Sequence, residues 1–219
     1  MRRPPPIALA AALFAATTAA GAGGETIDPW SALERLRARL AADGHLEADF
    51  RQSYVPAGFE LGDTESGSVA LAMPDCLRWD YREPYRKSFL VCGSRAWSWV
   101  EDEPRGQRFT IDAEREMGLD LLLLPASELE KRYRATATRA AGGEVELVLE
   151  PFDVEAELAV ANLGLDASGG RPLSLDWKDR EGNVTSFRFD RWRPLETESA
   201  FEPPAHLDWA DPATADPVR

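Results

Sequence analysis

The sequence predicts a mainly β protein of the α+β class, built on a single curved antiparallel sheet of about eleven strands. Short segments alternate between apolar and polar residues, and turn residues separate them along most of the 219-residue chain. Strands and helices do not alternate in the rhythm that parallel sheets require. Seven Trp and nine Phe provide a large apolar interior. Because flat sheets of this width are rare, we expect the sheet to curl, and the few helices to cover one opening.

The clearest element is a hairpin around Pro84, which ends one alternating segment and begins another. Proline fixes its own φ angle and cannot donate to a sheet ladder, so it favours a turn. Folding the chain back about Pro84 places Leu77 opposite Val91, and Trp79 opposite Phe89. The two apolar faces then coincide, which fixes the register.

The same register places Cys76 opposite Cys92 on the face away from Trp79. Directly opposed residues in an antiparallel pair lie close enough for a disulfide. We therefore expect this disulfide if the protein reaches an oxidising compartment. A slipped register or two free thiols is the alternative.

The first residues have the features of a signal peptide. Arg2 and Arg3 form a positive start, residues 7–16 form a short apolar run, and Ala20-Gly21-Ala22 offers a cleavage site. A disordered, Ala-rich leader is the alternative. We expect residues 1–22 to be removed and the mature protein to be soluble and periplasmic.

The charge of the chain excludes some partners. Its formal net charge is −13, and removal of two Arg residues with the signal peptide would make it −15. Such a surface repels phosphate backbones and anionic lipid headgroups, so nucleic acid is not an expected partner.

A helix is predicted from Asp28-Pro29, a typical N-cap and first position, to Asp43-Gly44. Leu33, Leu36 and Leu40 recur at helical spacing, and the opposite face carries Glu34, Arg35, Arg37 and Arg39. Eleven strands are expected at residues 46–52, 69–73, 77–82, 87–92, 95–100, 108–111, 133–138, 145–149, 157–160, 173–177 and 185–192. From Ala200 onward we expect an extended tail, disordered over 211–219.

The run Leu119–Leu124 is apolar without alternation, and Pro125 ends it. Two short helices with a break at the proline are predicted, and a buried strand is the alternative.

Catalytic motifs are weak. The two histidines, His45 and His206, accompany no nucleophile motif. His45, Glu47 and Asp49 share one strand face and offer metal ligands, but solvated polar faces have the same pattern. We therefore predict no enzyme activity, no catalytic residue, no metal site and no cofactor.

The binding signal is broader than any catalytic one. Six apolar side chains can share one concave sheet face: Phe50, Leu71, Leu77, Trp79, Phe89 and Val91. An ordinary hydrophobic core gives the same pattern and is the alternative to a ligand cavity.

These segments together resemble the periplasmic outer-membrane lipoprotein carriers, the LolA family. The matching residues are Phe50-Arg51-Gln52, then Pro74, Leu77, Arg78 and Trp79, then Pro84, Leu90, Gly93, Trp97 and Trp99, and finally Leu119–Leu124 with Phe201, Pro203 and Pro204. The resemblance runs from about Trp30 to Trp209. Met73 stands where the family usually has a basic residue, which bears on how a lid would be latched.

The resemblance implies an incomplete barrel over residues 23–210 with a helical lid over an apolar cavity. The lid would use Leu33, Leu36, Leu40, Leu119, Leu122 and Leu123. The implied function is that of a monomeric periplasmic carrier that shields lipoprotein acyl chains between membranes. An inner-membrane lipoprotein-releasing transporter would load it, and a lipid-anchored outer-membrane receptor of the same fold would unload it. A carrier of a non-protein lipid or polyene is the alternative.

Overall fold

The computed structural model describes residues 24–111, 121, 124–196 and 198–210. Thirteen strands of this part form one sheet in the order β1-β8-β9-β10-β11-β12-β2-β3-β4-β5-β6-β7-β13. The strands are β1 (Glu25–Ile27), β2 (His45–Val55), β3 (Asp63–Ala72), β4 (Cys76–Glu83), β5 (Lys87–Cys92), β6 (Arg95–Val100), β7 (Arg105–Thr110), β8 (Tyr133–Arg139), β9 (Val145–Pro151), β10 (Leu158–Leu165), β11 (Pro172–Asp179), β12 (Val184–Pro194) and β13 (Asp208–Ala210). The helices are α1 (Pro29–Ala42), α3 (Ala126–Leu129) and a 3₁₀ turn, η1 (Glu198–Phe201).

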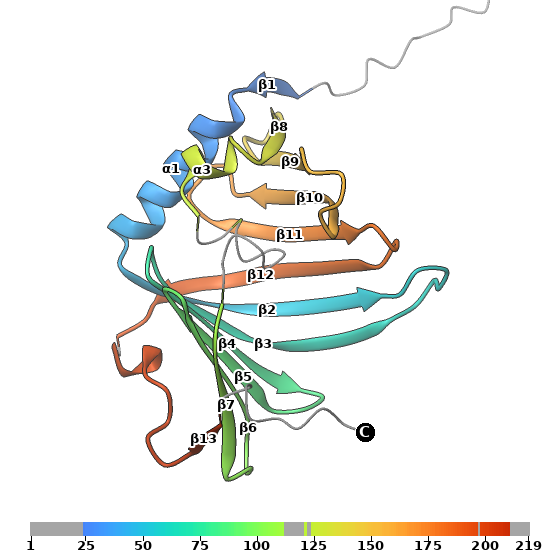
Figure 1. The fold of residues 1–219 in the computed structure, drawn as a ribbon. Coiled ribbons are helices and arrows are strands. Elements are labelled where there is room, and N and C mark those ends of the chain that lie inside the picture. The colour runs from blue at the N-terminus through green and yellow to red at the C-terminus, as the bar shows by residue number, and fades with distance from the viewer. Residues whose placement is uncertain (1–23, 112–120, 122–123, 197, 211–219) are drawn as a thin grey trace, which may run out of the picture.

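The predicted mainly β fold is confirmed. All eleven predicted strands are present as β2 to β12, and they pair with one another in antiparallel fashion. The strands change direction strongly between β8–β12 and β4–β7, so the sheet curves into an open, barrel-like shape (Figure 1). The two further strands, β1 and β13, are three residues long and lie at the two edges.

The hairpin about Pro84 has the predicted register. Leu77 pairs with Val91 and Trp79 with Phe89. Cys76 and Cys92 are joined by a disulfide, with their Cα atoms 4.2 Å apart. Apolar and polar residues alternate along β4 and β5, and Pro84 in the turn cannot donate to a ladder. These two features were sufficient to predict the pairing.

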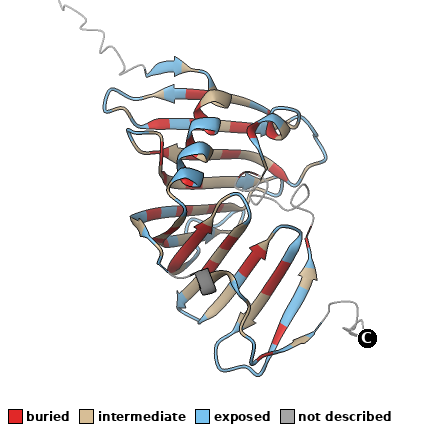
Figure 2. Cartoon of the chain, turned by 90° about the vertical axis from the view of Figure 1, so that its left-hand side faces the viewer, coloured by how far each residue is buried: buried red, intermediate tan, exposed pale blue. Residues whose placement is uncertain are grey.

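Helix α1 also begins and ends as predicted. The side chain of Asp28 caps it by accepting a hydrogen bond of 2.8 Å from the main-chain N–H of Ser31. Leu33, Leu36 and Leu40 are buried against the sheet, and the helix ends at Asp43. The helix lies along the inner side of the sheet (Figures 1 and 2).

The C-terminal segment differs from the predicted extended tail. It folds back over the face of β4–β7 that points away from Trp79, where Leu90 and Trp97 are buried. Arg78 donates a hydrogen bond of 2.9 Å to the carbonyl of Ala200 at η1. Strand β13 then pairs in parallel with β7 and brings Trp209 over the backbone of Gly106. This pairing joins residues about one hundred positions apart, which local sequence patterns do not encode.

Candidate functional site

The concave face of the sheet carries a continuous aromatic cluster. Phe50 of β2 lies edge-on to Trp79 of β4, with ring centroids 4.9 Å apart. Trp79 also contacts Phe187 of β12, at 4.8 Å between centroids. Phe187 in turn stacks on Phe189, with the ring planes 6° apart. Aromatic pairs of this kind add to the free energy of burying the rings, so the cluster stiffens the middle of the curved sheet.

Helix α1 closes over this face. Its three stripe leucines, Leu33, Leu36 and Leu40, belong to the same buried cluster as Phe50 and Trp79. A cavity of about 20 Å³ lies between helix and sheet, which is about the space of one water molecule. Its lining is almost entirely apolar: Leu33, Leu36, Arg37, Leu40, Leu71, Met73, Leu77, Leu121, Leu163 and Pro172. At this place, side chains of the described residues pack closely between helix and sheet.

Arg37 is the exception in this lining. We predicted it on the polar face of the helix, but it is half-buried, and its Nη2 donates a hydrogen bond of 3.1 Å to the carbonyl of Leu121. Met73 contributes apolar surface to the same cavity. The hydrogen bond from Arg37 to Leu121 therefore ties α1 to the segment around Leu121.

The six predicted cavity residues lie on one face, but in three environments. Phe50, Leu71, Leu77 and Trp79 are buried in the main cluster with the helix. Val91 is buried in a smaller cluster with Ala96 and Ile111. Phe89 is 37% exposed and touches the ring of Tyr81, at 5.9 Å between centroids. The concave face is therefore covered by α1 at one end and open at the other.

Of the predicted lid residues, Leu33, Leu36 and Leu40 lie as described. Leu119, Leu122 and Leu123 fall outside the described residues. Their neighbour Leu121 is buried and helical, and it lines the small cavity.

Some residues of this face were missed by sequence reasoning. They are Phe187 and Phe189 of β12, which pack directly on the predicted Trp79, and Trp177 of β11, which packs on Phe187. The alternation of β12 predicted the strand, but it did not reveal which strands would be neighbours. Only the pairing of β12 with β2, which sets Phe189 opposite Phe50, brings these rings together.

A polar group also reaches the aromatic cluster. The hydroxyl of Tyr81 donates a hydrogen bond of 2.7 Å to the side-chain oxygen of Gln52. Burial raises the pKa of Tyr81 above its ordinary value, and the nearby carboxylate of Glu65 raises it further. Tyr81 therefore stays neutral and acts as a hydrogen-bonded part of the wall.

The outer face of the sheet is ionic. Glu47 and Asp49, considered above as metal ligands, form ion pairs instead, with Arg193 at 3.0 Å and with Arg191. Burial alone would raise the pKa of Asp49, but the hydrogen bond and charge of Arg191 outweigh it and hold that pKa low. Within the described residues, no three His, Cys, Asp or Glu side chains gather closely enough to hold a metal ion.

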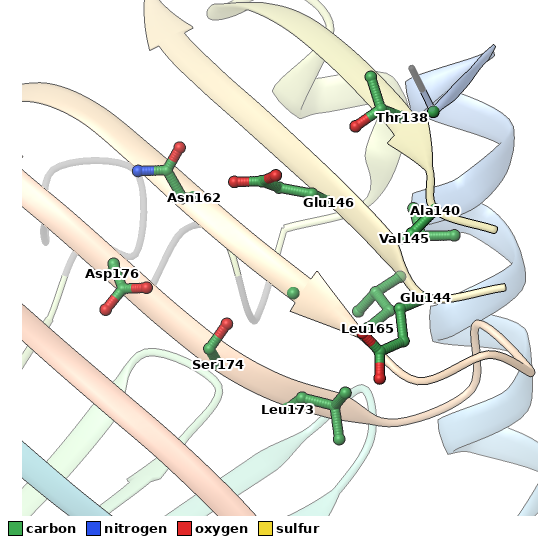
Figure 3. A pocket seen from close by; sticks show the side chains of 12 residues that line it. Thr138, Ala140, Glu144, Val145, Glu146, Asn162, Leu165, Leu173, Ser174 and Asp176 are labelled. Carbon is green, nitrogen blue, oxygen red and sulfur yellow. The ribbon is translucent and has the colours of Figure 1, made fainter. Parts of the chain in front are cut away.

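A hollow of about 370 Å³ also lies on this outer face, over β8–β11 (Figure 3). Its labelled side chains are mostly polar and include Glu146, Asn162, Ser174 and Asp176. Its lining offers hydrogen bonds rather than an apolar surface. The aromatic cluster lies on the concave side.

Comparison with models of protein families shows the family to which this chain belongs. Residues 44–202 match the model of the outer membrane lipoprotein carrier protein LolA. The chain belongs to the LolA family. The matched range covers β2 to η1, and so includes the whole aromatic cluster.

Individual relatives agree with this assignment. An outer-membrane lipoprotein carrier protein of Xanthomonas axonopodis pv. citri is 31% identical over 191 residues, which cover 84% of each chain. One of Chromobacterium violaceum is 26% identical over 188 residues, covering 86% of this chain and 87% of the other. Among solved structures, an uncharacterized conserved protein from Thermus thermophilus superposes with a TM-score of 0.54 at 12% identity, over 83% of this chain and 97% of that one. This last likeness concerns the fold alone.

In the described part of this LolA family member, no helix is both long and apolar enough to cross a bilayer.

Proposed function

We propose that this chain is a periplasmic carrier that shields the acyl chains of lipoproteins between α1 and the concave sheet, and moves them from the inner to the outer membrane. The observation that carries the proposal is the packing of the α1 leucines on the aromatic face, beside a cavity of about 20 Å³. Cargo and helix compete for one apolar surface. Loading then requires α1 to move, and release follows when the helix returns.

The free energies of burying the helix leucines and of burying an acyl chain support an exchange of one for the other. Burying the three stripe leucines stabilises the closed form by roughly 5–9 kcal/mol, at about 1.5–3 kcal/mol each. An acyl chain contributes about 0.8 kcal/mol per buried CH₂, so a chain of about sixteen carbons is worth roughly 12 kcal/mol. A long chain outweighs the helix by a few kcal/mol, whereas a short one does not. Binding is therefore strong enough for transport and weak enough for release.

The remaining features of the proposal follow from this role. Residues 1–22 serve as the cleaved signal peptide, residues 23–210 as the carrier domain, and residues 211–219 as a tail. The carrier acts as a monomer and without catalysis. An inner-membrane lipoprotein-releasing transporter loads it, and a lipid-anchored outer-membrane receptor accepts its cargo.

A disulfide between α1 and the sheet tests the proposal. Gly170, in the loop between β10 and β11, faces the last turns of α1, and a Cβ built on it would lie 3.7 Å from the Cβ of Arg39. This spacing suits a disulfide. In the double variant Arg39→Cys/Gly170→Cys, we expect oxidation to abolish binding of a fluorescent sixteen-carbon acyl probe, and reduction to restore it.

Two controls accompany the tether. Gly170→Cys alone should bind the probe under both conditions, and so should the wild-type protein, in which reduction opens only Cys76–Cys92. Full probe binding by the oxidised double variant would show that α1 does not move and would overturn the proposal.

The identity of the cargo needs a separate measurement. Mass spectrometry of the protein purified from the periplasm of its native host should recover acylated lipoproteins. Recovery of a free lipid or polyene instead would favour a carrier of a non-protein product.

A further inference from the structure

The exposed apolar side chains are concentrated at one end of the strands. Eight large apolar side chains are exposed in the described part of the chain, and seven lie in or directly beside the turns at that end. They are Tyr54, Phe59, Leu61, Tyr85, Val100, Phe152 and Val154. The turns at the opposite end of the sheet, at residues 73–75, 93–94, 140–144 and 166–171, expose none of them. Large exposed apolar sets of this kind mark interaction surfaces.

We call the turns at this end of the strands the hairpin rim: residues 56–62, 84–86, 101–104, 152–157 and 180–183. Contacts tie several of these turns together in two groups. The side chain of Arg180 donates to the carbonyl of Ala156 at 3.2 Å, and Asn183 accepts from the N–H of Ala57 at 2.9 Å. Arg86 pairs with Glu101 at 3.0 Å. In Figure 1 the β2–β3 and β11–β12 connections of this rim project on the right-hand side.

The rim is also strongly acidic. It carries eight carboxylates and two guanidinium groups, and all ten residues are exposed. The carboxylates are Glu60, Glu101, Asp102, Glu103, Asp153, Glu155, Glu157 and Glu181. Both arginines are already engaged, Arg86 by Glu101 and Arg180 by main-chain carbonyls. The net field at the rim is therefore negative.

A hollow lies beside the rim. It has a volume of about 370 Å³, and its lining includes the apolar Phe89 and Val100, the carboxylate of Glu103, and the cationic Lys87 and Arg105. Phe89 is the eighth exposed apolar side chain, so the hollow joins the rim to the open end of the concave face. Because its lining carries both signs of charge, the negative field of the rim comes from the turns and not from this hollow.

We propose that the hairpin rim is the docking surface for a membrane-embedded partner protein that presents basic side chains around an apolar contact. The proposal rests on the proposed function, because it names the surface through which a carrier meets its loading or receiving partner. Charge complementarity selects this occupant. Eight carboxylates repel an anionic bilayer and equally repel a second copy of the same rim.

Charge reversal on three separate turns tests the proposal. The rim variant is Glu60→Lys/Glu103→Lys/Glu155→Lys, and its matched neutral form carries Gln at the same positions. The control variant Glu25→Lys/Glu144→Lys/Glu146→Lys makes the same charge change on exposed positions away from the rim. A second rim variant, Phe59→Ser/Leu61→Ser, removes apolar contact without changing charge.

The readout is co-sedimentation of labelled protein with inner-membrane vesicles of the native host, compared with protein-free vesicles of the same extracted lipids. We expect the wild type and the control variant to bind the protein-containing vesicles, and the rim Lys variant to bind at least tenfold more weakly. The Gln and Ser variants should show smaller losses. Added salt should weaken wild-type binding.

The contrary results are distinct. Undiminished binding of the rim Lys variant would overturn the proposal. Binding of the wild type to protein-free vesicles would mean that the rim contacts lipid. A rim-dependent dimer in sedimentation equilibrium would mean that the rim contacts a second copy of the chain. Either result would overturn the proposal of a membrane-embedded partner protein.

The acyl-probe titration reports separately on the carrier function, because all these variants should retain probe affinity. If the wild type does not bind the acyl probe, the carrier function is rejected. The vesicle experiment still decides whether the rim is a docking surface.

Discussion

The guanidinium of Arg37 and the main-chain oxygen of Leu121 are joined by a hydrogen bond of 3.1 Å, and both residues line the small cavity under α1. This contact connects the helix to a segment 84 residues further along the chain. Met73, from the loop between β3 and β4, faces the same cavity with a thioether. Among the described residues, the polar contact that ties α1 to this segment is donated by Arg37 of the helix.

Replacing Arg37 should make loading easier. Arg37→Met keeps the apolar part of the side chain and removes the charged donor, which weakens the closed form by about 1.5–3 kcal/mol. Because cargo competes with the closed helix, we expect the acyl probe to bind at least tenfold more tightly, since tenfold corresponds to about 1.4 kcal/mol. Fluorescence titration measures this change. Arg35→Met, on the exposed face of the same helix, should leave the affinity unchanged; equal effects of the two variants would contradict a latch at Arg37.

Phe89→Asp should separate cargo binding from folding. Phe89 is 37% exposed, so the substitution should change the free energy of unfolding by less than about 1 kcal/mol. It places a charge on the open end of the concave face, and we expect probe affinity to fall at least tenfold. Leu61→Asp, at an 86% exposed position on the rim, is the control and should bind normally. Normal binding by Phe89→Asp would place the acyl chain elsewhere.

Trp79→Asp is not an equivalent experiment. Trp79 is buried between Phe50 and Phe187, so an aspartate there would be an unpaired charge in the core. We expect that variant not to fold, which circular dichroism and thermal unfolding would show.

The disulfide should stabilise the central hairpin. By the chain-entropy argument a loop of this length, with the cysteines 16 residues apart, contributes roughly 3 kcal/mol. We expect Cys76→Ala/Cys92→Ala to lower the free energy of unfolding by about that amount while it keeps the sheet. Urea unfolding measures the loss. Non-reducing peptide mapping of protein from the native periplasm should recover the two cysteines in one linked peptide pair, and two free thiols would disprove the bond.

The cap of α1 should make stability depend on pH. Hydrogen bonds from Ser31, first from its hydroxyl and then from its main-chain N–H, lower the pKa of Asp28. A carboxylate with a lowered pKa in the folded state contributes stability that is present above its unfolded pKa and is lost as the pH falls through the folded one. Asp28→Ala should therefore have a lower Tm than wild type at pH 7, and the difference should shrink in acid below the ordinary Asp range. Glu34→Ala, one turn along, should show no such trend.

The central hairpin and α1 could be predicted because their signals are local. Alternation around Pro84 fixed the pairing of Cys76 with Cys92, and the Asp28-Pro29 pair fixed the start of the helix. The environment of Phe89 could not be predicted in the same way. Residues that share one sheet face can differ in whether a helix covers them. In the structure Phe89 stays partly exposed and lies outside the buried cluster that α1 joins.

Non-local contacts explain the other differences. The two edge strands are three residues long, too short for a periodic signal, and their partners lie far away in the sequence. Arg37 was assigned to the polar face from its type and spacing. Its burial depends on Leu121, whose position relative to α1 is a property of the folded chain.

The pairing of Phe50 with Phe189 in the middle of the sheet has a consequence for how the chain folds. Strand β2 can pair early with β3, its neighbour in sequence, but its other edge has to wait for β12, which is the last long strand of the chain. Closing so large a loop is entropically costly and slow. Until β12 arrives, the inner face of β2–β5 lies open with its aromatic rings unpaired. The apolar surface proposed to receive an acyl chain is thus also the surface most prone to aggregate during folding, and an incomplete chain would be the form that most needs protection.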